Sequence, residues 1–139
     1  MTVPAVGGAA APLAQRYRER ATMLFGARDP DGASRAARRA LALAPGALPL
    51  LVLWGASERG AGRPTAALEA ARRATGRSPD STALWINRGN AAMDCGASVE
   101  MVASFRRALR LAPADAEIWQ RLGAGCGAAD AMADSVHAL

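Results

Sequence analysis

The sequence predicts an all-α protein made of stacked helical hairpins, and three observations lead to this fold class. Identical residues recur at a step of 34 positions in three columns, which are Pro45, Pro79 and Pro113, then Gly55, Gly89 and Gly123, then Ala40, Ala74 and Ala108. Between these columns, apolar residues follow the three- and four-residue spacing of an amphipathic helix. Alanine, the best helix former, is frequent, and no stretch alternates as a strand would. A fixed period of this length is typical of a repeat array.

The segment 81–113 shows the repeating unit most clearly. Trp85 and Gly89 lie on one face of a first helix, which a glycine-containing turn interrupts. Phe105 lies on the apolar face of a second helix, which Pro113 ends. We expect Gly89 to lie where the two helices touch, so that leucine there would overpack the contact. Alanine would be neutral or slightly stabilising there if space allows, since glycine is a poor helix former.

Capping residues and helix breakers divide the chain into eight expected helices. Asp29 followed by Pro30 suits the start of a helix, and Ser81 and Ser98 are expected N-caps. The helices are expected, in order, over roughly residues 13–25, 31–43, 47–58, 64–75, 82–94, 99–111, 113–126 and 129–137.

A 34-residue period of helix, turn and helix resembles the tetratricopeptide repeat (TPR) family. That family has large residues at repeat positions 4 and 11, a small one at 8, alanine at 20 and 27, an aromatic residue at 24 and proline at 32. The third repeat matches at Trp85, Gly89, Phe105, Ala108 and Pro113, and departs at Ala92 and Met101, an exchange of sizes that conserves volume. The resemblance implies a right-handed α-solenoid of about three and a half repeats, at residues 14–47, 48–81, 82–115 and 116–139.

Residues 1–12 stand outside this period. They are apolar, but proline and glycine oppose a continuous helix, and the positive region of a signal peptide is missing. We therefore expect a disordered leader at 1–12, followed by a single repeat domain at 13–139.

Three charged residues occupy positions at which TPR helices normally pack. Arg20 and Arg88 stand at repeat position 7, where the family usually has leucine, and Glu58 stands at position 11. A charge at a packing position needs a partner. Either Glu58 pairs with Arg88 or Arg20 across the stacked first helices, or each side chain extends its charged head into water.

The resemblance also implies a ligand surface, because TPR arrays bind peptides on the concave face formed by their first helices. The residues that map onto this surface are Arg18, Thr22, Val52, Ala56, Arg59, Asn87, Asn90, Asp94, Gln120 and Arg121. Asn87 and Asn90 are three apart, and an amide both donates and accepts, so the pair suits the backbone of an extended peptide. Arg121 can bind a carboxylate through two hydrogen bonds. The expected partner is a protein or peptide with an acidic side chain or a free C-terminal carboxylate.

Chaperone-binding TPR domains use a carboxylate clamp of lysine, asparagine and arginine. Asn87 and Arg121 match two of its places, but Val52 and Glu117 stand where lysine is required. The sequence therefore argues against a chaperone tail as the ligand.

Arginine pairs repeat with the period of the array. Arg38-Arg39, Arg72-Arg73 and Arg106-Arg107 are 34 residues apart, and the chain has a net charge of +5. The favoured interpretation is a solvated outer face in a chain of biased composition. A basic stripe for nucleic acid or anionic lipid is the alternative, which the lack of interleaved aromatic residues disfavours. Nucleic acid is therefore not the expected partner.

The sequence contains no known catalytic motif, so we expect a protein that is not an enzyme. A single histidine cannot supply a catalytic triad or a zinc site with Cys95 and Cys126, so neither a cofactor nor a metal is expected. The glycine-rich stretch 123–127 is better explained by helix packing than by a nucleotide loop. No apolar run is long enough to span a membrane, and a cytoplasmic location is the default.

The end of the sequence within the fourth repeat leaves two further hypotheses. The chain could be the repeat segment of a larger sulfotransferase or glycosyltransferase. Alternatively, the last helix lacks a polar cap and mediates self-association through the apolar residues Ala131, Met132, Val136 and Leu139.

Overall fold

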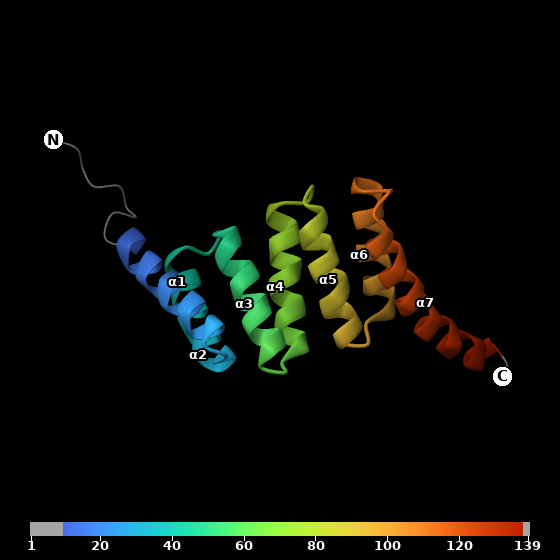
Figure 1. Cartoon of the computed structure of the whole chain (residues 1–139), viewed down its shortest axis with the longest axis horizontal. Coiled ribbons are helices and arrows are strands. Elements are labelled where there is room, and N and C mark those ends of the chain that lie inside the picture. The colour runs from blue at the N-terminus through green and yellow to red at the C-terminus, as the bar shows by residue number, and fades with distance from the viewer. Residues whose placement is uncertain (1–9, 138–139) are drawn as a thin grey trace. The chain divides into compact units, whose positions relative to one another are not determined.

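The computed structural model describes the backbone of residues 10–137, which consists of helices joined by short turns and loops (Figure 1). Side chains are described over residues 11–125. The helices are α1 (Ala10–Gly26), α2 (Pro30–Leu43), α3 (Leu48–Gly60), α4 (Pro64–Arg77), α5 (Thr82–Asp94), α6 (Ser98–Leu111) and α7 (Ala116–His137). The predicted all-α fold class is confirmed, and the first six helices lie within two residues of their expected bounds except for the start of α1.

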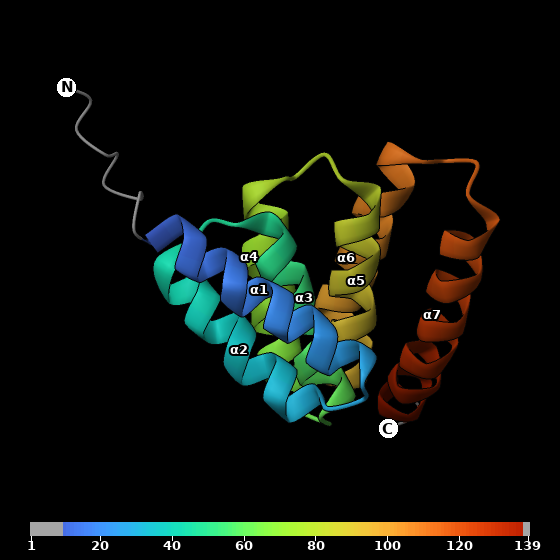
Figure 2. The same ribbon diagram turned by 60° about the vertical axis from the view of Figure 1, so that its left-hand side comes forward.

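The chain divides into two compact units between Arg77 and Ser78. In unit 1, α1 packs on α2, α2 on α3 and α3 on α4, and α1 also touches α3. In unit 2, α5 packs on α6 and α6 on α7. Consecutive helices run antiparallel within each unit, as hairpins require (Figure 2).

Each of the first three hairpins turns through a residue in the left-handed backbone region. Arg28, Gly62 and Gly96 are 34 residues apart and have φ values of 61°, 77° and 70°. The residue after each donates its backbone N–H to a carbonyl five positions back, at 2.9 Å in all three turns. This bond and its companion from the left-handed residue are the Schellman pattern, which satisfies the last carbonyls of the first helix. The turn at Arg28 therefore has the same backbone geometry as the two later turns, although they have glycine at this position.

Two of the three expected N-caps are present. The Asp29 carboxylate accepts from the Gly32 N–H at 2.9 Å, and the Ser81 hydroxyl accepts from the Leu84 N–H at 3.4 Å. The prediction for Ser98 was wrong, because Ser98 is the first residue of α6 and Ala97 occupies the cap position without a side-chain bond.

Small residues allow the helices of a hairpin to approach closely. Ala21, Ala33 and Ala40 are fully buried between α1 and α2. In unit 2, Gly89 on α5 faces the buried ring of Phe105 on α6, and a Cβ at position 89 would lie 2.6 Å from that ring. Gly89 therefore lies at the helix contact, and the space that alanine would need is filled.

Tryptophans at repeat position 4 fix the loops that lead into the first helices of unit 2. The Trp85 indole donates to the Pro79 carbonyl at 2.7 Å, and the Trp119 indole donates to the Pro113 carbonyl at 3.0 Å. Each bond spans six residues and crosses the loop before a first helix. The proline column of the sequence and the tryptophans at repeat position 4 thus define one contact that occurs twice in unit 2.

The fourth repeat differs from its prediction. The expected break after Cys126 is absent, and α7 continues from Ala116 to His137. Neither a proline nor a left-handed residue interrupts this stretch, whereas a left-handed residue marks each of the three earlier hairpin turns. Gly123 was expected at a helix contact, but a Cβ there would meet no described atom within 4 Å, and Gly125 instead approaches Met101. The proposed association residues at 131, 132, 136 and 139 and the Cys126 side chain lie outside the described side chains.

We predict opposite effects of alanine at two equivalent glycines. Gly89→Ala should lower the free energy of unfolding by about 1–3 kcal/mol, since its methyl group would overlap the Phe105 ring. Gly123→Ala, at the same repeat position but without a facing neighbour among the described residues, should raise it by about 0.5–1 kcal/mol. Denaturant unfolding followed by circular dichroism measures both, and equal shifts would contradict the assigned contact.

The left-handed turn residue provides a second test. Arg28→Gly should stabilise the protein by up to about 1 kcal/mol, because a left-handed conformation costs an L-residue about 1–2 kcal/mol and glycine gives back part of this in backbone entropy. Gly62→Ala should have the reverse effect. A lower melting temperature for Arg28→Gly would show that its side chain stabilises the turn.

Candidate peptide-binding site

In unit 1, the five predicted contact residues lie on α1 and α3, the first helices of two repeats. Arg18 and Thr22 on α1 and Val52 and Arg59 on α3 are exposed, and Ala56 is half-buried. The Thr22 hydroxyl donates to the Arg18 carbonyl at 3.0 Å, so it is engaged by its own helix. The exposed side chains among these residues are therefore Arg18, Thr22, Val52 and Arg59.

In unit 2, the predicted contact residues lie on α5 and α7. Asn87 is exposed, but Asn90 is only 8% exposed. The side-chain Oδ1 of Asn90 accepts a hydrogen bond from Arg121 Nη1 at 2.9 Å, which joins the two helices. The two asparagines thus have different roles, because Asn90 orients Arg121 and Asn87 alone presents an open amide.

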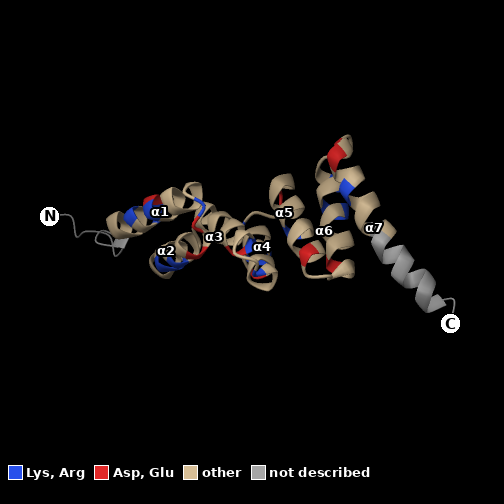
Figure 3. Cartoon of the chain, turned by 60° about the horizontal axis from the view of Figure 1, so that its bottom comes forward, with Lys and Arg blue, Asp and Glu red and all other residues tan. Residues whose placement is uncertain are grey.

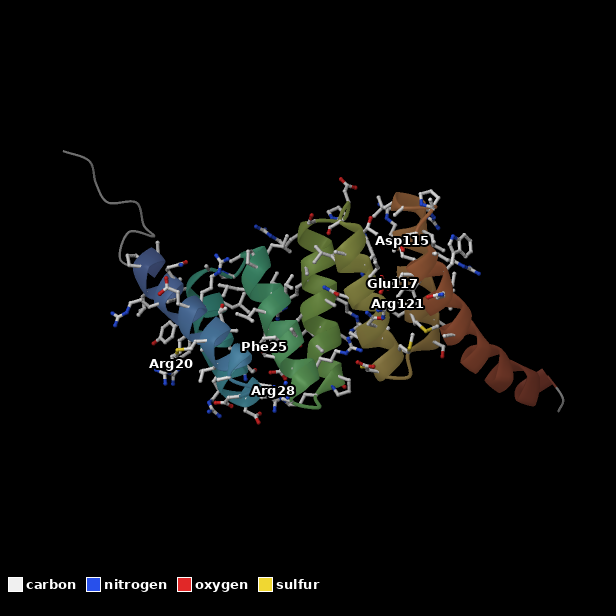
Figure 4. The ribbon with its side chains drawn as sticks, in the orientation of Figure 1. Arg20, Phe25, Arg28, Asp115, Glu117 and Arg121 are labelled. Atoms are coloured by element: carbon white, nitrogen blue, oxygen red, sulfur yellow. The ribbon has the colours of Figure 1, made fainter. Side chains whose placement is uncertain are left out.

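Arg121 already has a carboxylate partner. Glu117, one turn earlier on α7, accepts from Arg121 at 2.7 and 3.1 Å (Figure 4). The two side chains are 38% and 63% exposed, so water screens the pair. A carboxylate brought by a ligand would have to compete with Glu117.

The remaining two predicted residues flank this network. Gln120 precedes Arg121 on α7, and Asp94 ends α5, both with exposed side chains. The structure therefore brings Asn90 and Arg121 into contact, while Asn87, Gln120 and Asp94 lie exposed on the same two helices.

The expected partners of Glu58 were wrong. Glu58 accepts hydrogen bonds from Ser34 on α2 and from Arg63 Nε, the latter at 2.7 Å, and Arg63 also reaches Asp31 at 2.6 Å. Arg88 instead lies 3.7 Å from Glu100 within unit 2. Glu58 is 4% exposed, and its partners come from the adjacent turn and the preceding second helix rather than from a first helix.

Aromatic stacking of the repeated arginines was missed in the sequence. At repeat position 26, Arg39 lies 5.9 Å from the centre of the Tyr17 ring, and Arg107 lies 5.9 Å from the Trp85 ring. Arg73 lies 5.5 Å from a ring of Trp54. These distances suit cation–π contacts. The sequence did contain a pattern that could have predicted these contacts, since each of these repeats carries an aromatic residue at position 4 or 7 of its first helix.

The first arginine of each pair remains exposed. Arg38, Arg72 and Arg106 stand at repeat position 25 on the second helices. Arg39 and Arg73 at position 26 are exposed as well, so these arginines contact their aromatic rings at the surface.

Further kinds of site are not evident in the described part of the chain. No helix there is long and apolar enough to cross a membrane. Within the same residues, no group of three or more His, Cys, Asp or Glu side chains could hold a metal ion. Cys95 is half-buried with a free thiol.

Solved structures share this fold. The first TPR of Spaghetti (RPAP3), solved with the HSP90 peptide SRMEEVD, matches with a TM-score of 0.77 and 18% identity over 86% of this chain and 94% of that one. The Sgt2 TPR domain from Aspergillus fumigatus matches with a TM-score of 0.74 and 16% identity over 86% and 80%. The Thermobaculum terrenum O-GlcNAc transferase matches with a TM-score of 0.69 and 24% identity over 90% of this chain but 23% of that one.

These likenesses define the class of fold. The chain has the fold of TPR domains, with about three and a half repeats of helical hairpins, and the resemblance seen in the sequence is confirmed at this level. Comparisons with protein families and with curated proteins give no match.

Acid should weaken the fold through Glu58. Burial raises the pKa of its carboxyl group, but the hydrogen bonds from Arg63 and Ser34 and the Arg63 charge outweigh burial and hold the pKa below its usual value. The stabilisation is therefore present above the unfolded-state pKa and is lost as pH falls through the folded-state pKa. Glu58→Gln should lower the free energy of unfolding at pH 7 by about 1 kcal/mol and flatten its decline toward acid pH.

The matched control is Glu69→Gln, which removes an exposed carboxylate bonded to Arg73 at 2.9 Å. Its effect at pH 7 should be much smaller. Urea denaturation at a series of pH values measures both, and parallel pH profiles for Glu58→Gln and wild type would contradict the assignment.

Proposed function

We propose that this chain is a non-catalytic module that binds an extended peptide along the first helices of its repeats. The observation that carries the proposal is the arrangement on α5 and α7. There, Asn87 offers an exposed amide, and Arg121 is held in place by the buried Asn90. An amide suits a peptide backbone, and a guanidinium suits a carboxylate.

The Arg121–Glu117 pair determines which peptides would bind well. Asn90 restricts the conformation of Arg121 before a ligand arrives, which lowers the entropy cost of binding. Glu117 accepts a hydrogen bond from the guanidinium at 2.7 Å and so competes with a ligand carboxylate for it. The ligand is therefore a peptide whose acidic side chain or terminal carboxylate displaces Glu117.

The ligand differs from the chaperone peptide of the RPAP3 structure. A chaperone clamp requires lysine where this chain has Val52 and Glu117, so the further carboxylates of the chaperone peptide would meet no lysine at these two positions. A fluorescently labelled SRMEEVD peptide should accordingly bind weakly to wild type.

A second function is favoured by one comparison. The O-GlcNAc transferase matches this chain over 90% of its length while 23% of that enzyme is covered. On this hypothesis the chain is the repeat segment of a larger transferase that presents protein substrates. The coding sequence downstream of Leu139 tests it, since a following transferase domain would support it.

Location and assembly belong to the same proposal. We expect a cytoplasmic protein that self-associates through the end of α7. Cell fractionation and light scattering at micromolar concentration test these expectations, and a clean monomer would contradict the second.

The binding site is tested with peptides selected on the protein from a library with free C-termini. Arg121→Ala should weaken binding more than Asn87→Ala, because a charge-assisted hydrogen bond contributes about 1.5–3 kcal/mol and a neutral one roughly 1. Glu117→Gln should strengthen binding, since it removes the competing carboxylate. Isothermal titration calorimetry measures the three affinities.

One control variant and one stability measurement separate binding from folding. Arg106→Ala removes the same charge from an exposed site on α6 and should leave affinity unchanged. Arg121→Ala should also lower the free energy of unfolding by about 1 kcal/mol, because it leaves the buried side-chain oxygen of Asn90 without this hydrogen bond. The proposal fails if Arg106→Ala loses affinity while Asn87→Ala and Arg121→Ala bind like wild type.

A further inference from the structure

A pocket of about 210 Å³ opens between α1 and α2 in unit 1. Its walls include Tyr17, Arg20 and Leu24 from α1, Asp29 from the turn, and Arg35 and Arg39 from α2. None of the ten predicted peptide-contact residues lines it. The pocket is thus a feature separate from the candidate peptide site, with three guanidinium groups and one carboxylate in its wall.

The later repeats show what normally accompanies these arginines. At repeat positions 22 and 26, α4 carries Glu69 and Arg73, which pair at 2.9 Å. In the third repeat, Arg88 at position 7 lies 3.7 Å from Glu100 at position 19. Each of these repeats therefore places a carboxylate beside one of its arginines, although Arg107 at position 26 of the third repeat follows Ala103 at position 22.

The first repeat has an acidic residue at neither of these positions, whereas the second and third repeats have one each. Arg35 replaces the acidic residue at position 22, and Gly32 stands at position 19. Arg20, Arg35 and Arg39 form no ion pair with any residue that the structure describes, although Asp29 shares their pocket. Arg35 and Arg39 are also four apart on one helix, a spacing at which like charges destabilise each other. An anion from outside would supply the missing charge.

Charge around the pocket points the same way. The segment from α1 to α2 contains seven arginines and three carboxylates, and basic residues mark both helices (Figure 3). Arg39 is supported by its contact with the Tyr17 ring, so one wall of the pocket is held in position. The volume lies below the roughly 300–1,000 Å³ of pockets for drug-sized ligands, and it suits a single anionic group.

We propose that this pocket binds the phosphate group of a phosphomonoester. Guanidinium groups reach it from two helices, so several phosphate oxygens can accept hydrogen bonds at once, whereas one guanidinium is enough for a carboxylate. Asp29 lies at the α2 N-terminus, where its carboxylate is engaged by the Gly32 N–H at 2.9 Å. The site does not depend on the proposed peptide-binding function.

The single tyrosine of the chain reports on the site. The full chain with ¹³C-labelled tyrosine is titrated with inorganic phosphate, O-phosphoserine and acetate at constant ionic strength, and the Tyr17 ring resonances are followed by NMR. Both phosphates should give saturable shifts, with a dissociation constant at least tenfold lower than that of acetate. Equal affinity for acetate, or no binding of O-phosphoserine, would overturn the proposal.

Variants separate the pocket from the general basic charge. Arg35→Glu copies the acidic residue of the second repeat, so it should abolish phosphate binding while keeping or raising the melting temperature. Arg38→Glu makes the same charge change at an exposed neighbour outside the pocket and should alter the dissociation constant less than threefold. Arg20→Ala provides an independent test and should weaken binding at least tenfold. The proposal is overturned if Arg38→Glu matches Arg35→Glu, or if Arg20→Ala binds like wild type.

Discussion

The close approach of the two helices in each hairpin is the constraint on which the rest of the structure depends. It requires small residues where the helices meet, and their sizes are matched in pairs. In the first repeat, Ala21 at position 8 is buried against a second helix with Ala37 at position 24. In the third repeat, Gly89 at position 8 accommodates Phe105 at position 24, which is fully buried. The third repeat can therefore bury a large ring at position 24 because position 8 has no side chain, which keeps the packing dense.

The period in the sequence was sufficient to predict this framework, because a repeated contact leaves a repeated residue type. It could not show where the repeat ends. Gly123 continues the small-residue column, yet it has no close neighbour among the described residues, since α7 continues without a turn. The small-residue column correctly predicted the register of the first helix of the fourth repeat. It could not predict that the turn after this helix is absent. The same reasoning explains Arg28, whose left-handed conformation is fixed by the Schellman hydrogen bonds rather than by its residue type.

Side-chain partners were harder to predict than backbone register. The sequence placed Glu58 among first helices because its repeat position packs there. Its strongest partner, Arg63, stands five residues later in the turn, and Ser34 comes from the previous hairpin. Likewise, Asn90 and Arg121 were predicted as ligand contacts, and the structure shows them bonded to each other. Repeat position defines a neighbourhood of several side chains, and the choice among them depends on reach and competing charges.

The net charge of +5 conceals an uneven distribution that bears on function. Residues 1–77 contain twelve arginines and five carboxylates, whereas residues 78–139 contain five arginines and seven carboxylates. A long-range attraction of anions therefore originates in unit 1. In unit 2, the proposed recognition of an acidic ligand would rely on the local geometry of Arg121, because the surrounding charge opposes it. The backbone thus repeats while the charge changes along the chain, and the proposed ligand discrimination would depend on the positions at which the repeats differ.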